Sequence, residues 1–329
     1  MRNNTRLNAS AWLAGALGLA LAAGPAAVLA DAYPDHAIGT MVSYSPGGAT
    51  DFQARLVTMM AQEDEFLGQP IYIVNKPGAG GQVGWNWFAT KAGTDGYDLA
   101  AYNVPHIIAQ SIVFDTKYNV DNLEPIANWG ADPAVLIVPQ DSPFNSARDL
   151  IEYAKANPGK VTVTGAGLYV GHHIATLQVE KAAGVKLKYV PTKGGVDAMR
   201  MVLGGQVMAG MNNLSDAYRA KDKLKILAVA DLERSSFLPD VPTFKEQGYD
   251  VDDASVNFRG LMVRKGTPQP VIDFLAERVP AMFRAPKVEK KMAEGGSPMR
   301  VMTRDQVRAM WQKRQAYLTE LLADLRQKK

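Results

Sequence analysis

The chain has 329 residues and a formal net charge of +3, from 36 Lys and Arg against 33 Asp and Glu. So balanced a charge gives no basis for nucleic-acid binding or for a role at a membrane surface, and neither partner is expected. The chain has no cysteine, which excludes disulfides, thiol chemistry and a lipid anchor on cysteine. The length is enough for two domains of roughly 130–150 residues each.

Residues 1–30 are predicted to be a secretory signal peptide. Arg2 and Arg6 give a positively charged start, and residues 11–23 form an apolar stretch that is too short for a good membrane anchor. The residues before position 31 favour cleavage after Ala30, with cleavage two residues later as the alternative. The mature protein is therefore expected to be exported and soluble.

Strand-like and helix-like segments alternate along the rest of the chain, as judged from apolar runs and helical periodicity. In chain order the sequence predicts strand 38–44, helix 52–66, strand 71–75, helix 81–91, strand 97–102, helix 105–113, an extended run at 124–139, helix 149–156, strand 160–164, helix 171–183, strand 185–190, helix 196–203, strands 207–211 and 225–230, turns at 231–257, strand 259–263, and helices 270–284, 286–294 and 303–327.

This alternation predicts an α/β fold. Repeated strand–helix units favour parallel sheets with helices on both faces. A long extended run at 124–138 and a return near 258–263 predict two lobes joined by two crossover strands. The expected lobes are residues 31–129 plus 258–329, and residues 130–257. A ligand cleft is then expected between the lobes, at the carboxyl ends of the strands.

The loop at residues 45–51 is the strongest candidate for a binding site. It contains Gly47 and Gly48, and it lies between a predicted strand and a predicted helix. Glycine lets the backbone approach a bound group closely, and the first N–H groups of a helix lack intrahelical partners and attract anions. The loop therefore predicts a backbone-built site for a carboxylate or phosphate; an ordinary strand–turn–helix corner is the alternative. Asp51 is expected to cap the helix and organise the loop, because a bare carboxylate would repel an anion.

No catalytic, metal or cofactor site is predicted. The sequence lacks a Gly-x-Ser-x-Gly elbow, a phosphate-loop lysine motif and a His-Glu-x-x-His motif. Glycine clusters at 78–84 and 165–171 follow predicted strands, but the last glycine comes one residue late for a dinucleotide fingerprint. Adjacent His172 and His173 point to different faces of a helix and cannot form a metal pair, and a core or capping role is expected for His173.

Three more side chains are expected near the cleft. His106 follows a predicted strand, where it either contacts ligand or has a structural role. Arg259, at the return crossing, either forms a forked pair with a ligand carboxylate or an ion pair with Asp252 or Asp253. Trp129 lies near the first crossing, as a hinge or cleft aromatic.

Seven short segments, modest one by one, form a specific series because they follow one another in a consistent order. They include Tyr-Ser-Pro-Gly-Gly-Ala-Thr-Asp and Asn-Lys-Pro-Gly-Ala-Gly-Gly, and they lie at 44–51, 68–70, 75–81, 95–97, 193–195, 203–207 and 238–243. From about Tyr33 to the C-terminus, this series resembles the Bug, or tripartite tricarboxylate transporter, receptor family of periplasmic solute-binding proteins.

The resemblance implies a two-lobe periplasmic binding protein of type II, a "Venus flytrap", that holds a carboxylate between two strand–helix loops. One is the 45–51 loop, and the other corresponds to residues 165–173. The family usually has small hydroxyl residues in the middle of the second loop, where this chain has Tyr169, Val170 and Gly171. Backbone N–H groups are therefore expected to replace hydroxyl contacts, and the Tyr169 ring is expected to line the distal pocket and favour a flat or aromatic acid.

The expected function is that of a monomeric periplasmic receptor. It captures a small organic carboxylate, either a di- or tricarboxylate or an aromatic acid, with an amino acid also left open, and delivers it to the integral-membrane permease subunits of a tripartite transporter, with no cofactor. Two rival interpretations are an exported α/β enzyme that acts on a small carboxylate and a sensor subunit that presents its ligand-bound form to a membrane kinase. The expected ligand-binding residues are Tyr44, Ser45, Gly47, Gly48, Ala49, Thr50, Asp51, His106, Gly167, Leu168, Tyr169, Val170, Gly171, Thr192, Asn212 and Arg259.

Overall fold

The computed structural model describes residues 33–323, and the expected signal peptide at residues 1–30 lies outside them. The described residues from Pro34 onward form one compact unit. Across this part of the chain, no helix is both long enough and apolar enough to cross a membrane.

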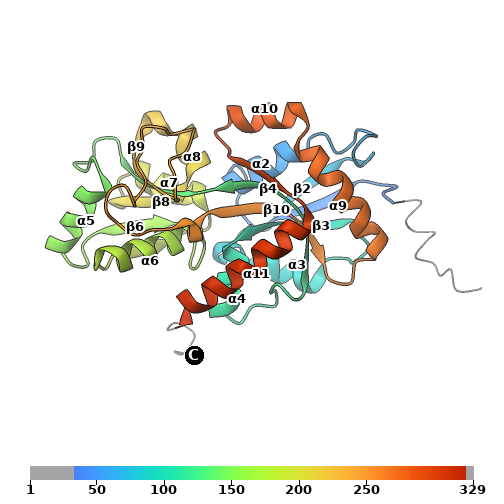
Figure 1. The fold of residues 1–329 in the computed structure, drawn as a ribbon, viewed down its shortest axis with the longest axis horizontal. Coiled ribbons are helices and arrows are strands. Elements are labelled where there is room, and N and C mark those ends of the chain that lie inside the picture. Colours follow the sequence, from blue (N-terminus) through green and yellow to red (C-terminus); the bar gives the residue numbers. More distant parts are fainter. Residues whose placement is uncertain (1–32, 324–329) are drawn as a thin grey trace, which may run out of the picture. The chain divides into compact units, whose positions relative to one another are not determined.

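The first of two sheets consists of β1 (Ile38–Val42), β2 (Ile71–Asn75), β3 (Asp98–Val104), β4 (Leu123–Asp132), β10 (Asn257–Arg264) and β11 (Met299–Met302). The strand order is β11-β4-β10-β3-β1-β2 (Figure 1). β1 is parallel to β2 and to β3, whereas β10 is antiparallel to β3 and β4, and β11 is antiparallel to β4.

The second sheet consists of β5 (Ala134–Pro139), β6 (Thr162–Gly165), β7 (Lys188–Pro191), β8 (Ala209–Asn213) and β9 (Leu224–Ala230), in the order β7-β6-β8-β5-β9. β6 is parallel to β7 and β8, and β5 is antiparallel to β8 and β9. Pro133, which has no N–H to donate to a ladder, separates β4 from β5, and the chain changes sheets there. β4 and β10 pair along their length and run side by side in Figure 1.

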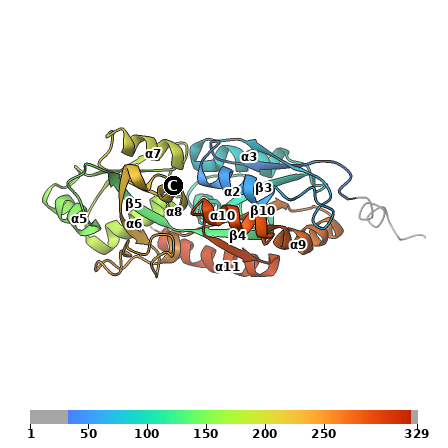
Figure 2. The ribbon, with the colours of Figure 1, turned by 90° about the horizontal axis from the view of Figure 1, so that it is seen from above.

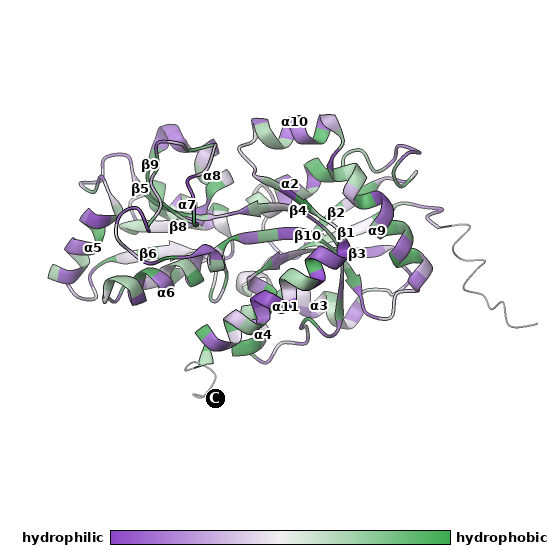
Figure 3. Ribbon diagram, in the orientation of Figure 1, coloured by the Kyte–Doolittle hydropathy of each residue, from purple (hydrophilic) through white to green (hydrophobic). Residues whose placement is uncertain are grey.

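Helices cover the sheets. The helices that accompany the first sheet are α2 (Ala49–Val57), α3 (Gln82–Lys91), α4 (His106–Val113), α9 (Gln269–Phe283), α10 (Pro286–Glu294) and α11 (Arg304–Leu321). The helices that accompany the second sheet are α5 (Ala147–Ala156), α6 (Gly171–Ala183), α7 (Gly195–Leu203) and α8 (Leu214–Arg219). Short 3-10 turns are Ala79–Gly81, Lys221–Lys223 and Asp253–Ser255. Figure 2 separates α3 from α11 on opposite faces of the first sheet. Hydrophilic and hydrophobic residues alternate along α5, α9 and α11 in Figure 3, as in helices that pack one face on a core.

Each sheet with its helices is called a lobe below, the first lobe being the six-stranded one. The two-lobe α/β fold agrees with the prediction. The expectation of parallel sheets is confirmed for β1, β2 and β3 and for β6, β7 and β8, but it is wrong for the remaining strands, through which the chain returns antiparallel. The expected lobe limits at 129/130 and 257/258 remain a prediction.

Some expected elements have other limits. The helix expected at 52–66 is α2, which starts at Ala49 and ends at Val57, where the Thr58 hydroxyl donates to Ala54 O and the chain turns. The strand expected at 207–211 is β8, so Asn212 lies inside a strand. α8 and β11 were not expected from the sequence.

A buried ion pair ties the two lobes together. Arg259 of β10 and Asp132 at the end of β4 are both fully buried, with 2.6 Å between Nη1 and Oδ2. The same guanidinium donates from Nη2 to Asn213 Oδ1 of β8 at 2.7 Å, and from Nε to Thr50 Oγ1 of α2 at 3.2 Å. It therefore links the second lobe to the strands and to the first helix of the first lobe.

The expected pairing of Arg259 with Asp252 or Asp253 is wrong. Asp253 pairs with Arg314 of α11 at 2.8 Å, and Asp252 accepts from the Tyr317 hydroxyl at 2.7 Å. Both carboxylates are held by the C-terminal helix.

Arg259→Met should lower the free energy of unfolding by about 3–5 kcal/mol, because it leaves the buried Asp132 carboxylate without its cation. Adding Asp132→Asn should restore much of this loss, since it removes the unpaired charge. Arg200→Met, which breaks the exposed Arg200–Asp197 pair, should cost less than about 1 kcal/mol. Urea unfolding measures all three. A cost for Arg259→Met no larger than that for Arg200→Met would contradict the role given to the buried pair.

Candidate functional site

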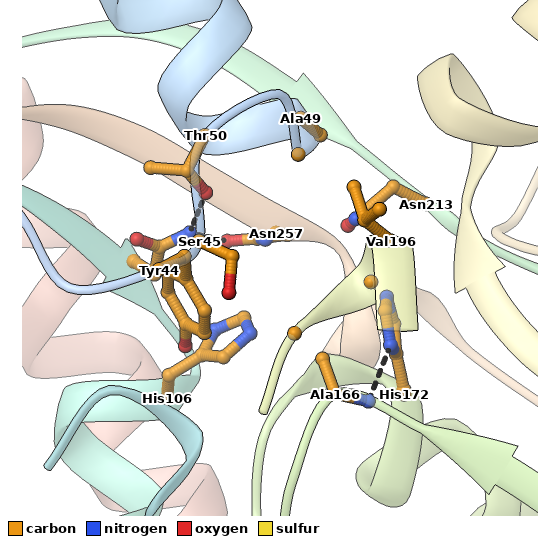
Figure 4. A pocket seen from close by; sticks show the side chains of 14 residues that line it. Tyr44, Ser45, Ala49, Thr50, His106, Ala166, His172, Val196, Asn213 and Asn257 are labelled. Carbon is orange, nitrogen blue, oxygen red and sulfur yellow. Dashed lines mark hydrogen bonds between the residues drawn. The ribbon is translucent and has the colours of Figure 1, made fainter. Parts of the chain in front are cut away.

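A cavity lies where the two lobes meet, lined by fourteen residues (Figure 4). From the first lobe come the loop before α2, the end of β3 with the start of α4, and the start of β10: Tyr44, Ser45, Gly48, Ala49, Thr50, Asn103, His106 and Asn257. The second lobe contributes Ala166, His172, Gly194, Gly195, Val196 and Asn213. None of these described residues is Asp, Glu, Lys or Arg.

The start of α2 forms one wall of the cavity. Gly48 is the N-cap residue, with φ −73° and ψ 166°, and no side chain caps the helix. The N–H groups of the first turn therefore have no intrahelical partner, and the positive end of the helix dipole lies at the cavity. Gly47, with φ +81°, makes the turn and donates its N–H to Asp51 Oδ2 at 2.9 Å.

Asp51 does not line the cavity. Its carboxylate accepts from Arg55 Nε at 3.1 Å and from Asn75 Nδ2 at 2.9 Å. Burial opposes ionisation of this carboxyl, but the hydrogen bonds from Arg55, Gly47 and Asn75 outweigh it and lower the pKa of Asp51. The side chain is thus an anion that braces the loop from behind.

The start of α7 forms the facing wall, from the second lobe. Its N-cap residue is Gly194, again without a side-chain cap. A Cβ on Gly194 would lie 3.9 Å from Ser45 Oγ, and a Cβ on Gly48 would lie 3.5 Å from Val196 Cγ2, so the two loops almost touch. Two uncapped helix starts from different lobes therefore converge on one cavity.

Two buried histidines lie on opposite sides of the cavity (Figure 4). His106 Nε2 accepts the Gly171 N–H at 3.3 Å, and His172 Nδ1 accepts the Ala166 N–H at 3.1 Å. Burial lowers the pKa of His172 to about 4 and that of His106 well below its usual value, with Arg259 adding to both shifts. Both rings are neutral at pH 7, and the accepting nitrogen of each carries no proton, so His106 Nδ1 and His172 Nε2 carry it.

His173 and Tyr169 form a separate contact beside the cavity. The Tyr169 N–H donates to His173 Nδ1 at 3.1 Å, and Tyr169 has φ +55°. The Tyr169 ring packs against Phe114 of the first lobe, with 5.3 Å between ring centroids, and against His173 at 5.0 Å. The ring thus bridges the lobes and is not part of the cavity wall, and its effect on ligand choice remains a prediction.

Of the residues expected to bind ligand, those in the wall are Tyr44, Ser45, Gly48, Ala49, Thr50 and His106. Those outside it are Gly47, Asp51, Gly167, Leu168, Tyr169, Val170, Gly171, Thr192, Asn212 and Arg259. The guanidinium of Arg259 donates its hydrogen bonds to other side chains of the protein. Asn212 and Thr192 support the α7 start, through Asn212 Nδ2 to Gly195 O at 3.0 Å and the Thr192 hydroxyl at 2.9 Å from Gly194 O.

The expected residues did not include Asn103, Gly194, Gly195, Val196, Asn213 and Asn257, nor Ala166 and His172, although these last two lie in the expected 165–173 loop. The Lys193-Gly194-Gly195 segment before a predicted helix has the same glycine-plus-helix pattern as the 45–51 loop, and that signal could have identified the α7 start. The asparagines lie at strand ends, where only the assembled sheets bring them together.

Direct contacts close the lobes over the cavity. Besides the Gly171–His106 bond, Gln110 Nε2 of α4 donates to Leu168 O at 3.0 Å. A Cβ on Gly167 would lie 2.6 Å from the Gly80 Cα, so the two backbones pack closely. The cavity volume is about 20 Å³, little more than one water needs. A larger ligand can enter only when the lobes part.

Over residues 33–323, no group of three or more His, Asp or Glu side chains could hold a metal ion. The groups that the cavity wall offers to a ligand are therefore backbone N–H groups, two histidines and side-chain amides.

Comparison with known proteins identifies the family. Residues 54–325 match the family described as tripartite tricarboxylate transporter family receptor. Protein BugT of Bordetella pertussis is 32% identical over 86% of this chain and 87% of its own. The structure of periplasmic binding protein BugD superposes with a TM-score of 0.82 at 29% identity, covering 89% of this chain and 98% of that one. MatC from Rhodopseudomonas palustris with bound malate has a TM-score of 0.79 at 25% identity, covering 88% and 100%.

The chain belongs to the tripartite tricarboxylate transporter receptor family, and it is a two-lobe solute-binding protein.

Gly48→Val should weaken ligand binding at least about tenfold, or ~1.4 kcal/mol. The backbone angles of Gly48 suit any residue and its Cβ would meet only ordinary contacts, so the fold should survive while the two methyl groups occupy the cavity. Gly47→Ala is the matched control: its Cβ meets nothing within 4 Å, and its left-handed backbone should cost about 1–2 kcal/mol of stability but leave affinity nearly intact. Calorimetry on both variants measures this. Unchanged affinity in Gly48→Val would place the ligand elsewhere.

Stability should fall as the pH drops from about 6.5 towards 4. The pKa values of His172 and His173 are lowered to about 4 by burial, whereas unfolded histidines titrate near 6.5. The unfolded chain therefore takes up protons in this window that the folded chain does not, so the contribution is complete above pH 6.5 and lost on the way down. Arg259 and Asp132 are the charged groups that act on His172, in opposite directions.

Urea unfolding between pH 7.5 and 5 measures this, above the range where most carboxylates titrate. His173→Gln should make the decline shallower. A free energy of unfolding that stays constant over that range would contradict the buried, neutral state of these rings.

Proposed function

We propose that this receptor captures a small organic carboxylate between its lobes and delivers it, chemically unchanged, to the integral-membrane permease subunits of a tripartite transporter. It would act in the periplasm, as a monomer, after removal of residues 1–30. The observation that carries the proposal is the convergence of two uncapped helix starts, α2 and α7, on one cavity without charged side chains.

Helix starts suit an anionic ligand because they offer N–H donors and a positive dipole end without a buried counter-charge. Each charge-assisted hydrogen bond is worth roughly 1.5–3 kcal/mol and each helix start about 0.3–1 kcal/mol. Three or four such contacts, less the ordering costs of binding, reach about −8 kcal/mol, which corresponds to micromolar affinity.

The histidines support binding rather than catalysis. A general base needs a nitrogen lone pair that faces the substrate. In His106 and His172 the unprotonated nitrogen already accepts a backbone N–H, from Gly171 and Ala166. Neither ring has a free lone pair to take a proton, and both can only donate.

The relatives support the same class of ligand. MatC, which carries malate in its structure, shares the fold at 25% identity, and BugD is a periplasmic binding protein. A receptor mechanism also needs contacts that form better in the closed state, since a ligand shifts an equilibrium only through such a difference. α2 and α7 lie on different lobes, so a ligand held by both would favour closure.

A thermal-shift screen of small carboxylates, followed by small-angle scattering, tests the proposal. A true ligand at 100 times its dissociation constant should stabilise the protein by about 2.7 kcal/mol. It should also reduce the radius of gyration and change the emission of Trp129, whose indole N–H donates to Gln53 at 3.0 Å in the interlobe network. Gly48→Val should show neither effect.

Two outcomes would contradict the proposal. Failure of every carboxylate to stabilise the protein would exclude the ligand class. Tight binding without compaction would indicate a rigid pocket within one lobe, and it would exclude closure as the mechanism.

A further inference from the structure

His106 and His172 each have a buried ring nitrogen at the cavity that makes no well-formed hydrogen bond, although the Asn213 side chain is close enough to His172 to raise its pKa against the effect of burial. They are His106 Nδ1 and His172 Nε2, and each side chain is 2% exposed. Because the other nitrogen of each ring accepts a backbone N–H, both unpartnered atoms are N–H donors. A buried donor without an acceptor is costly, and two of them, one from each lobe, flank the same cavity (Figure 4).

We propose that His106 and His172 are ligand-reading residues, each donating its free N–H to a different oxygen acceptor of the bound acid. This inference rests on the proposed function. It adds that the ligand carries a second oxygen acceptor besides its first carboxylate, because the two donors come from opposite lobes. The start of α7, with Gly194 and Gly195, lies in the wall on the His172 side and favours a negatively charged acceptor there.

The same groups disfavour an ammonium group on the ligand. The described residues that line the cavity include no Asp or Glu, and the buried side-chain acceptor there without a partner is the neutral Asn103 Oδ1. An ammonium would lie beside two N–H donors and two helix starts. Amino acids should therefore bind much more weakly than the corresponding acids without the amino group.

The free N–H donor is Nε2 in His172 but Nδ1 in His106, and this difference allows a matched test. In His172 the backbone bond uses Nδ1 and the free donor is Nε2. Asparagine can place an oxygen near Nδ1 but has nothing near Nε2, whereas glutamine can place its NH2 near Nε2. In His106 the positions are exchanged, because the backbone bond uses Nε2 and the free donor is Nδ1.

The experiment measures affinities by calorimetry at pH 7.5 for malonate, succinate, glutarate and adipate, for the monocarboxylates of the same chain lengths, and for aspartate and glutamate. The wild-type protein should bind at least one dicarboxylate tenfold or more tightly than the matched monocarboxylate and amino acid. His172→Asn and His106→Gln, which keep the backbone bond and lose the donor, should reduce that dicarboxylate affinity about tenfold. His172→Gln and His106→Asn, which keep the donor, should stay within about threefold.

Thermal unfolding of each variant separates misfolding from lost recognition. The reverse ranking, with His172→Gln and His106→Asn the weaker binders, would assign the rings a purely structural role and overturn the inference. Monocarboxylates that bind the wild type as tightly as dicarboxylates would also overturn it, while leaving the proposed function intact. If no acid in the panel binds the wild type, the proposed function fails and this inference fails with it.

Discussion

The buried pair between Arg259 and Asp132 is the constraint on which the rest of the architecture depends. Two opposite charges out of water are stable only when the geometry is good and other polar groups complete their hydrogen bonding. Here the partners that complete it are Thr50 of α2, Gln53 of α2 and Asn213 of β8. Satisfying the pair therefore fixes the start of α2 against the end of a strand in the other lobe. The cavity lies between those same elements, and Thr50 and Asn213 belong both to this network and to the cavity wall, so the network places the cavity's donors.

The sequence alone predicts those parts of the site that a single short segment of the chain forms. The loop at 45–51 could be recognised because glycine and the helix start that follows it dictate an uncapped turn wherever they occur. The partner of Arg259 could not be recognised, since Asp132 is 127 residues away and Asp252 and Asp253 are nearer in the chain. The start of α7 was missed for the same reason: it reaches the cavity because of the order β7-β6-β8, which the pairing of distant strands decides. The expected 165–173 loop does contribute Ala166 and His172 to the wall.

The histidines show how far a side chain's chemistry can depend on distant backbone. Alone, a histidine is a donor, an acceptor or a cation near neutral pH. His106 becomes a neutral donor because the N–H of Gly171, 65 residues away and on the other lobe, occupies Nε2. Closure of the lobes thus makes the bond that sets the tautomer. In an open form, His106 would lose this acceptor role, and the ring would be free to change its tautomer or charge. Recognition of a second acceptor, as proposed here, is then a property of the closed state.

The dependence of His106 on a backbone N–H of the other lobe suggests how a receptor can hold a ligand and still release it. A guanidinium in direct contact with a carboxylate would bind tightly through a bidentate pair, and most of that affinity would appear as slow dissociation. In this protein Arg259 is fully buried, is paired with Asp132 and does not line the cavity, so its guanidinium is not free to make such a contact. The groups that we propose to hold an anion are neutral: backbone N–H groups at two helix starts, and the ring N–H groups of His106 and His172. Parting the lobes separates α2 from α7 and frees His106 from Gly171 in the same movement, so the affinity would decline together with the geometry that produces it.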